Sequence, residues 1–246
     1  MSRGPLLLTR AAEQDSVAMF AAHGWQVTHV PCIRVADPAD PAALDRALAT
    51  LDYDWLVLTS QNAVARVRAR TADLGGAKIA VVGAETARAL HEHFGRAPDC
   101  VPRVARGEAL ADELDATLAP GSRLLWLRAA EARDVLPEQL RVRGHHLDVV
   151  IAYRVEPALE HASALAAWLT RHRHERAIVV FASSRTAHSF FHLVEDEQIV
   201  EMIHEFRYAC ISPITASALA THGVHAHFVA REHTVRGLLD TLRAEA

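Results

Sequence analysis

The chain repeats itself once, with a period of about half its length. The sequence LLLTRAAE at residues 6–13 returns as LLWLRAAE at residues 124–131. Two later segments recur in the same order: VLTS at 57–60 returns as VFAS at 180–183, and TARAL at 86–90 returns as TASAL at 215–219. Stacked-repeat architectures have periods of about 20–50 residues, so this single duplication predicts two similar domains. Two such domains that face each other form a cleft, and clefts bind small molecules.

Short apolar segments alternate with helical patterns through both halves, which is typical of an α/β fold. The segments 79–82 and 177–181 are apolar throughout, as strands buried on both faces of a parallel sheet are. We therefore predict two open, doubly wound parallel sheets. The predicted strands are 5–9, 26–30, 55–59, 78–82, 99–102, 122–127, 147–152, 177–182, 207–211 and 226–229, and the predicted helices are 12–23, 42–51, 61–71, 85–94, 107–118 and 235–242.

Two boundaries between the domains fit the sequence. Ala119-Pro120-Gly121 separates the two copies of the repeat along the chain. Alternatively, Asp37-Pro38 and Glu156-Pro157 follow extended apolar segments at equivalent places in the two halves, and those segments would pair as a hinge. The residue pattern leaves both divisions open.

The composition argues against several classes of function. With 26 Lys and Arg against 30 Asp and Glu, the net charge is −4, so the basic surface expected of a nucleic-acid-binding protein is missing. No apolar run reaches the roughly 20 residues that span a membrane, and the N-terminus lacks signal-peptide features. Three widely spaced cysteines suit a reducing compartment. We therefore expect a cytoplasmic protein, and the absence of coiled-coil heptads favours a monomer.

Sequence motifs for metals and cofactors are missing as well. The 16 histidines form no His-Glu-x-x-His motif and have no cysteine or acidic partner at ligand spacing. Gly75-Gly76 and Gly83 make neither a dinucleotide fingerprint nor a P-loop, and no nucleophile elbow surrounds Ser60 or Ser183. We expect neither a metal nor a cofactor.

Small or hydroxyl-bearing residues recur where predicted strands end and helices begin. Ligands of open α/β sheets bind at this edge, and the free N–H groups of helix N-termini attract carboxylates. For any single hydroxyl, capping of the helix is the stronger interpretation, but the repetition in both halves favours binding. The segments are Thr9-Arg10, Thr59-Ser60-Gln61-Asn62, Gly83-Ala84-Glu85-Thr86, Leu127-Arg128, Ala182-Ser183-Ser184-Arg185 and Ser212-Pro213-Ile214-Thr215.

Three further side chains are candidates for function. Arg10 and Arg128 each follow the first strand of a repeat, where a guanidinium can bind a carboxylate through two hydrogen bonds. Ion pairs with Glu13 and Glu131 explain these arginines equally well. Tyr153 ends the apolar run 149–152 in one of the two hinge segments, where its phenol either faces the cleft or is buried at the domain junction.

The ordered set of segments resembles the uroporphyrinogen-III synthase family over nearly the whole chain. The chain departs from the family at Ser212, where glycine usually precedes the proline, and at Asn62, where some members carry arginine. The resemblance is carried by Leu7–Arg10, Pro31–Ile33, Tyr53–Val64, Val82–Ala87, Arg143–Arg154, Phe181–Ser184 and Ile211–Ala216.

The resemblance implies two flavodoxin-like α/β domains joined by a two-stranded linker, with a cleft between them. In this family the first βαβ unit joins the domain that is built mainly from the second half of the chain. Carried over, the first domain is 1–35 plus 155–246 and the second is 36–154, with linker strands near 31–35 and 150–155.

The resemblance also implies an enzyme of heme biosynthesis that works without a cofactor. Its substrate is hydroxymethylbilane, a linear tetrapyrrole with eight carboxylates, which closes to uroporphyrinogen III with inversion of ring D and loss of water. The family tyrosine, which would assist departure of the hydroxyl, matches Tyr153. The one protein partner suggested is the preceding enzyme of the pathway. The expected substrate-binding residues are Arg10, Thr59, Ser60, Asn62, Gly83, Ala84, Thr86, Arg128, Ser183, Ser184, Pro213, Ile214 and Thr215.

Two other functions fit the same residues. A cytosolic two-domain binding or sensor module that closes over a small polyanion would use the same repeat, hinge and helix starts. A family-like domain that has lost activity and serves as a regulatory partner fits too, although Tyr153 and the hydroxyls argue against it.

Overall fold

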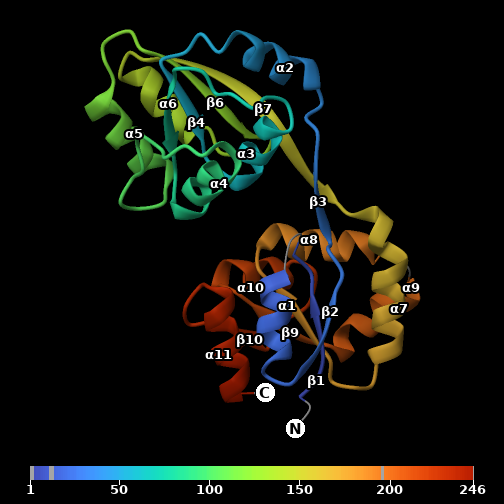
Figure 1. Cartoon of the computed structure of the whole chain (residues 1–246). Coiled ribbons are helices and arrows are strands. Elements are labelled where there is room, and N and C mark those ends of the chain that lie inside the picture. The colour runs from blue at the N-terminus through green and yellow to red at the C-terminus, as the bar shows by residue number, and fades with distance from the viewer. Residues whose placement is uncertain (1–2, 11–13, 195–196, 246) are drawn as a thin grey trace. The chain divides into compact units, whose positions relative to one another are not determined.

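The computed structural model describes residues 3–10, 14–194 and 197–245, which form two compact units (Figure 1). Unit 1 comprises Met1–Arg34 and Glu156–Ala246, and unit 2 comprises Val35–Val155. Each unit is built around a sheet of mainly parallel strands with helices on both faces. The chain therefore has an α/β fold with parallel sheets, as predicted.

The described part of unit 1 contains a five-stranded sheet in the order β10-β9-β8-β1-β2, with every neighbouring pair parallel. Residues of α7 to α10 pack against one face of this sheet, and residues of α1 and α11 pack against the other. The strands are β1 (Gly4–Leu8), β2 (Trp25–His29), β8 (Ile178–Phe181), β9 (Arg207–Cys210) and β10 (Phe228–Val229). The helices are α1 (Gln14–Ala21), α7 (Ala162–His172), α8 (Ser184–Leu193), α9 (Glu197–Met202), α10 (Pro213–Ala220) and α11 (Val235–Glu245), with short 3-10 turns at Leu159–His161 and Ile203–Glu205.

Unit 2 has the strand order β3-β7-β6-β4-β5, and the pairs β5-β4, β4-β6 and β6-β7 are parallel. Residues of α2, α3 and α4 pack against one face, and residues of α5 and α6 pack against the other. The strands are β3 (Ile33–Ala36), β4 (Trp55–Leu58), β5 (Lys78–Val81), β6 (Arg123–Ala129) and β7 (His146–Pro157), and the helices are α2 (Pro41–Thr50), α3 (Gln61–Arg68), α4 (Ala84–Phe94), α5 (Gly107–Thr117) and α6 (Val135–Val142).

Successive residues of the central strands enter opposite cores. Leu7 packs with Val179 and Phe181 on one face, whereas Leu6 and Leu8 pack on the other. All five side chains are buried, and the least buried of them, Leu8, is 3% exposed. Burying a Leu contributes about 1.5–3 kcal/mol. The continuous apolar pattern therefore reflects burial on both faces, as predicted.

The two copies of the repeat exchange strands between the two sheets. In unit 1, β1 of the first copy pairs with β8 of the second, with Leu6 opposite Ile178. In unit 2, β6 of the second copy pairs with β4 of the first, with Leu124 opposite Trp55. Because β4 and β6 share a sheet, the chain is not divided at residue 120. Residues 11–13 of the first copy lie outside the described residues.

Two predicted strands differ from the structure. The segment 99–102 makes only one bridge, between Cys100 and Ala80, because Pro102 has no N–H to extend the pairing. The strand predicted at 147–152 continues as β7 to Pro157, with β3 next to it in the sheet order. Both β3 and β7 cross the boundary between the units. No helix in the described ranges is long and apolar enough to cross a membrane.

A tight turn starts α11, whose residues Val235 and Leu238 line a small hollow with Thr9 and Arg10 at the end of β1. The Gly237 amide donates to the Thr234 hydroxyl at 2.9 Å. A Cβ on Gly237 would stand 2.3 Å from the carbonyl oxygen of Glu232, a backbone atom. Only glycine fits at this turn without a shift of the backbone.

We therefore expect Gly237→Ala to lower the free energy of unfolding by about 1–3 kcal/mol. Gly107→Ala is the matched control, because a Cβ there meets nothing within 4 Å at the first residue of α5. Urea unfolding of both variants tests this, and equal midpoints would show that the turn relaxes around the added methyl.

Candidate active site

Three serines cap helices at the carboxyl edges of the two sheets. The Oγ atoms of Ser60, Ser183 and Ser212 accept hydrogen bonds from the backbone N–H three residues later, at 3.1, 3.1 and 3.3 Å. These residues immediately precede α3, α8 and α10, and all three have extended backbones. The capping interpretation of these hydroxyls is confirmed, and each cap is worth about 1 kcal/mol.

The third helical residue completes a recurring pattern. It is a buried threonine in α8, α10 and α4, namely Thr186, Thr215 and Thr86 at 0%, 2% and 4% exposure. In unit 1 the hydroxyls of Ser183 and Thr186 lie 2.8 Å apart, and those of Ser212 and Thr215 lie 3.1 Å apart. Thr86 and Thr215, two of the expected substrate-binding residues, are therefore packed inside their helix starts.

In unit 2 the starts of α3 and α4 depart from this pattern. The residue that begins α4 is Gly83, which has no side chain to offer Thr86, and the third residue of α3 is Ala63. The hydroxyl of Ser60 consequently meets a different partner. It lies 2.9 Å from the phenol oxygen of Tyr153.

An irregularity in β7 directs Tyr153 toward Ser60. Arg128 of β6 pairs with Ile151, but the next residue, Ala129, pairs with Tyr153. Ala152 is therefore an extra residue, and such a bulge changes the direction of the side chains that follow it. Ile151 is exposed, whereas Ala152 and Tyr153 are both buried in the unit 2 core, at 0% and 6% exposure.

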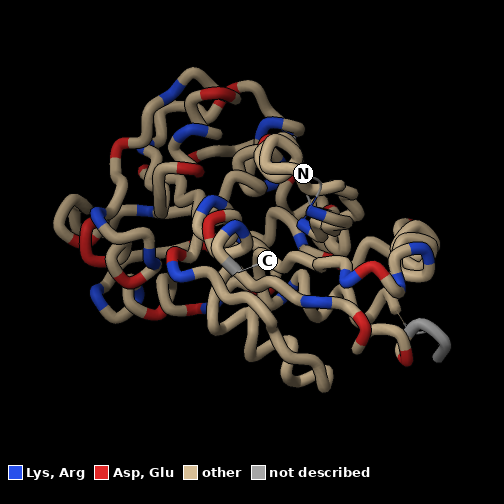
Figure 2. The backbone as a smooth tube through the Cα atoms, turned by 90° about the horizontal axis from the view of Figure 1, so that it is seen from below, with Lys and Arg blue, Asp and Glu red and all other residues tan. Residues whose placement is uncertain are grey.

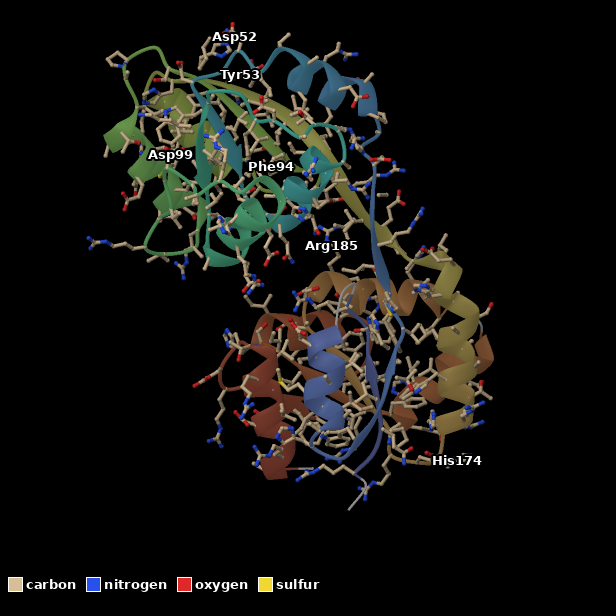
Figure 3. The ribbon with its side chains drawn as sticks, viewed as in Figure 1. Asp52, Tyr53, Phe94, Asp99, His174 and Arg185 are labelled. Atoms are coloured by element: carbon tan, nitrogen blue, oxygen red, sulfur yellow. The ribbon has the colours of Figure 1, made fainter. Side chains whose placement is uncertain are left out.

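Tyr153 is the tyrosine of this chain that reaches a helix start. Tyr53 precedes β4 at the opposite edge of the sheet and donates to Asp148 at 2.9 Å (Figure 3); burial, followed by this hydrogen bond, raises the pKa of Tyr53. Tyr208 is fully buried and donates to the carbonyl of Ile203 at 2.6 Å, and burial raises its pKa. The structure thus brings together Ser60 and Tyr153, which the sequence named for separate roles.

The two arginines that follow the first strands of the repeats have different environments. Arg10 is exposed. The Arg128 side chain is only 7% exposed and pairs with Asp134, not with the expected Glu131. Its Nε donates to the Ala129 carbonyl at 3.1 Å, and its guanidinium lies 4.5 Å from the centre of the Trp126 ring. Arg128 therefore holds the turn before α6.

The expected partner of Arg128 is occupied elsewhere. Glu131 accepts a hydrogen bond from the amide of Val155 at 3.3 Å. The possible partner of Arg10, Glu13, lies outside the described residues. The ion pair expected between Arg128 and Glu131 is therefore replaced by one with Asp134.

A hollow of about 220 Å³ opens at the carboxyl edge of unit 2. Its lining includes Thr59, whose hydroxyl accepts from the indole of Trp126 at 3.2 Å. Arg106, Glu108 and Arg133, near the starts of α5 and α6, also line it, and both arginines are exposed. Neither arginine was among the residues expected from the sequence, although each lies near a helix start.

The remaining expected binding residues lie at helix starts and are exposed or half-buried. Ser184 donates to the carbonyl of Ile214 at 3.3 Å, which joins the starts of α8 and α10. Ile214 is 76% exposed, unusual for an apolar side chain. Asn62, Ser183 and Gly83 are half-buried, and Ala84 and Pro213 are exposed.

Charges of both signs are interspersed along both units (Figure 2). Among the described residues, no group of three or more His, Cys, Asp or Glu stands close enough to hold a metal ion. Hydroxyls, backbone amides and arginines at the strand ends suit anionic ligands.

A family model described as uroporphyrinogen-III synthase HemD matches residues 14–240. The chain belongs to the uroporphyrinogen-III synthase family. It is 32% identical to the uroporphyrinogen-III synthase of Synechococcus elongatus, over 95% of this chain and 92% of that protein.

Two solved structures of this family share the fold. The crystal structure of uroporphyrinogen-III synthetase from Helicobacter pylori covers the whole of both chains with a TM-score of 0.65 at 17% identity. A mutant uroporphyrinogen III synthase from Thermus thermophilus covers 98% of this chain and 97% of its own, with a TM-score of 0.58 at 20% identity. At these identities the likeness supports the α/β fold with parallel sheets and no individual site residue.

In this member of the synthase family, Asp134 compensates a buried charge, which gives a stability prediction. We expect Asp134→Ala to lower the free energy of unfolding by about 1–3 kcal/mol, because it leaves the Arg128 guanidinium buried without its carboxylate. In an Arg128→Met background the same change should cost less than about 0.5 kcal/mol. Urea unfolding of the four proteins measures both values.

Asp52→Ala provides the control for this cycle. Asp52, which is labelled in Figure 3, pairs with Arg123 at 2.8 Å. The two side chains are 84% and 49% exposed. Its loss should cost at most about 1 kcal/mol, as for other exposed pairs. Equal costs for Asp134→Ala with and without Arg128 would contradict the assignment.

Proposed function

We propose that this protein converts hydroxymethylbilane to uroporphyrinogen III, inverting ring D and releasing water. Membership of the family supports the reaction. The observation that carries the proposal for this chain is the hydrogen bond between Tyr153 and Ser60, which joins a phenol to a helix start at the carboxyl edge of a parallel sheet. Ligands of such sheets bind at this edge.

The strand orders support the proposal of two flavodoxin-like domains. When the strands of unit 1 are numbered along the chain, their order across the sheet is 2-1-3-4-5. In unit 2, leaving out β3 and numbering β4, β5, β6 and β7 from one to four gives the order 2-1-3-4. In sheets of this order the ligand binds where the direction of winding changes, next to the first and third strands. Thr9 and Ser183 follow those strands in unit 1, and Thr59 and Ser60 follow the first strand of unit 2. We propose that units 1 and 2 are the two domains of the family.

We propose that each unit binds side-chain carboxylates of the bilane at its helix starts. The α8 and α10 starts offer backbone amides near Ser184, Pro213 and Ile214, and the α3 and α4 starts offer them near Asn62 and Ala84. A helix N-terminus attracts a carboxylate through its free N–H groups and dipole. Arg10 adds an exposed guanidinium in unit 1, while the exposed Ile214 side chain suits contact with a pyrrole ring.

Tyr153 supplies the proton for the first chemical step. Its phenol donates to the terminal hydroxyl of the bilane, the carbon–oxygen bond breaks, and water leaves with the electron pair. The pyrrole nitrogen stabilises the resulting cation, so no cofactor is needed. Attack by the substituted carbon of ring D gives a spiro intermediate, which fragments and recloses with the ring inverted. The remaining task is to hold the chain so that this carbon lies nearest, which is catalysis by positioning.

The product isomer tests the proposed function directly. Purified protein incubated with freshly made hydroxymethylbilane should give uroporphyrinogen III faster than the bilane closes unaided. Formation of uroporphyrinogen I alone, at the unaided rate, would overturn the proposal. Tight binding of the bilane without turnover would instead favour a binding module.

Removal of the Tyr153 hydroxyl should then lower kcat roughly 100-fold or more, the usual share of a general acid. Tyr153→Phe keeps the ring that packs in the unit 2 core, so the fold should remain intact. Tyr53→Phe is the matched control, since its hydroxyl bonds to Asp148 at the other edge of the sheet. Steady-state rates and circular dichroism of both variants check this. An unchanged kcat in Tyr153→Phe would exclude Tyr153 from the chemistry.

A further inference from the structure

We propose that Ser60 is a positioning residue that sets the direction of proton transfer from Tyr153. The inference rests on the proposed function and extends it, because it assigns Ser60 a role through Tyr153 instead of a direct hold on the substrate. The two oxygens lie 2.9 Å apart. The residues are 93 positions apart in sequence and come from different elements, β7 and the start of α3.

The hydrogen-bonding capacity of Ser60 fits this role. A serine hydroxyl donates once and accepts twice. One acceptor position of Ser60 is taken by the Ala63 amide at 3.1 Å. When the Ser60 hydroxyl donates to the phenol oxygen, the proton of Tyr153 is free to point away from Ser60. Ser60 then fixes the rotation of the phenolic O–H, which packing of the ring does not fix.

The other helix starts show that this arrangement is specific to α3. At α8 and α10 the capping hydroxyl pairs with a threonine three residues later, at 2.8 and 3.1 Å. At α3 that position is Ala63, which is fully buried and has no polar group. The Ser60 hydroxyl, which accepts from the Ala63 amide, therefore meets no side-chain hydroxyl of its own helix. The phenol of Tyr153 takes the place that threonine has in unit 1.

The same contact stabilises the charge that develops on Tyr153. As the phenol proton passes to the departing hydroxyl, the carbon–oxygen bond breaks, water leaves and a phenolate remains. The Ser60 O–H donates to this oxygen, and the amide of Ala63 polarises Ser60 at the positive end of α3. The proton that the substrate loses when the new carbon–carbon bond has formed and the ring regains aromaticity restores the phenol, so protons balance over one turnover.

Ser60→Ala should lower kcat roughly ten- to hundred-fold with little change in KM, as expected for loss of a hydrogen bond to a charged group. Ser60→Thr keeps the hydroxyl and should recover most of the rate. In a Tyr153→Phe background, Ser60→Ala should change kcat less than about twofold, because residues that act as a unit are not additive.

Ser183→Ala is the matched control for this cycle. It removes a cap with the same 3.1 Å hydrogen bond and extended backbone, but its hydroxyl contacts Thr186 and no phenol. Its effect on the rates should be the same factor with and without the Tyr153 hydroxyl. Thermal unfolding should show similar losses of stability for both serine variants, so a difference in kcat does not arise from the cap.

A second pair of variants tests the competition for Ser60. Ala63→Thr introduces the threonine found at the other helix starts, whereas Ala63→Val has the same shape without the hydroxyl. Both add volume to a buried position, and the difference between them isolates the hydroxyl. We expect kcat of Ala63→Thr to be several-fold below that of Ala63→Val. Should both fail to fold, the Ser60 and Tyr153 cycle decides alone.

The outcomes separate this inference from the proposed function. If the wild-type protein gives only uroporphyrinogen I, the proposed function fails. If it gives uroporphyrinogen III and Ser60→Ala has the same effect in both Tyr153 backgrounds, only the role of Ser60 is overturned. A rise in KM with unchanged kcat in Ser60→Ala would likewise overturn it and show a direct contact with the substrate.

Discussion

The pairing of strands from different copies of the repeat determines the rest of this structure. β1 lies next to β8, and β6 lies next to β4, in the equivalent registers Leu6 with Ile178 and Leu124 with Trp55. Neither copy contains a complete sheet, because its first two strands and its later strands belong to different units. The chain must therefore cross between the units twice, through β3 and β7. Within each sheet, the same parallel pairing places the carboxyl ends of strands from both copies side by side, next to the helix starts.

Much of the fold follows from patterns that are local along the chain. Apolar runs such as 177–181 predict strands buried on both faces because each side chain enters a core. The segment 99–102 was also predicted to be a strand but pairs only once, since Pro102 cannot donate to a neighbour. The bulge at Ala152 leaves no trace in the sequence, because it depends on the register between β6 and β7. Whether the two units correspond to the domains of the family stays a prediction.

The site shows the same division between local and long-range information. The caps at Ser60, Ser183 and Ser212 involve atoms three residues apart, so the sequence was sufficient to predict them. Asp134 replaces the expected Glu131 as the partner of Arg128, because this pair and the burial beside Trp126 depend on how the turn before α6 packs. Arg106 and Arg133 were missed because the hollow they border exists only once α5 and α6 are in place.

Duplication gives this chain several equivalent helix starts, and only a local difference can make one of them reactive. Where threonine follows the cap, as at Ser183 and Ser212, the hydroxyl is engaged within its own helix and serves mainly the fold. Ala63 removes that partner at α3, and the extra residue Ala152 brings the phenol of Tyr153 to the hydroxyl left available. Neither difference alone would join the phenol to the helix start. Binding can therefore rely on features that both copies share, whereas the proposed chemistry depends on two features that occur together in unit 2.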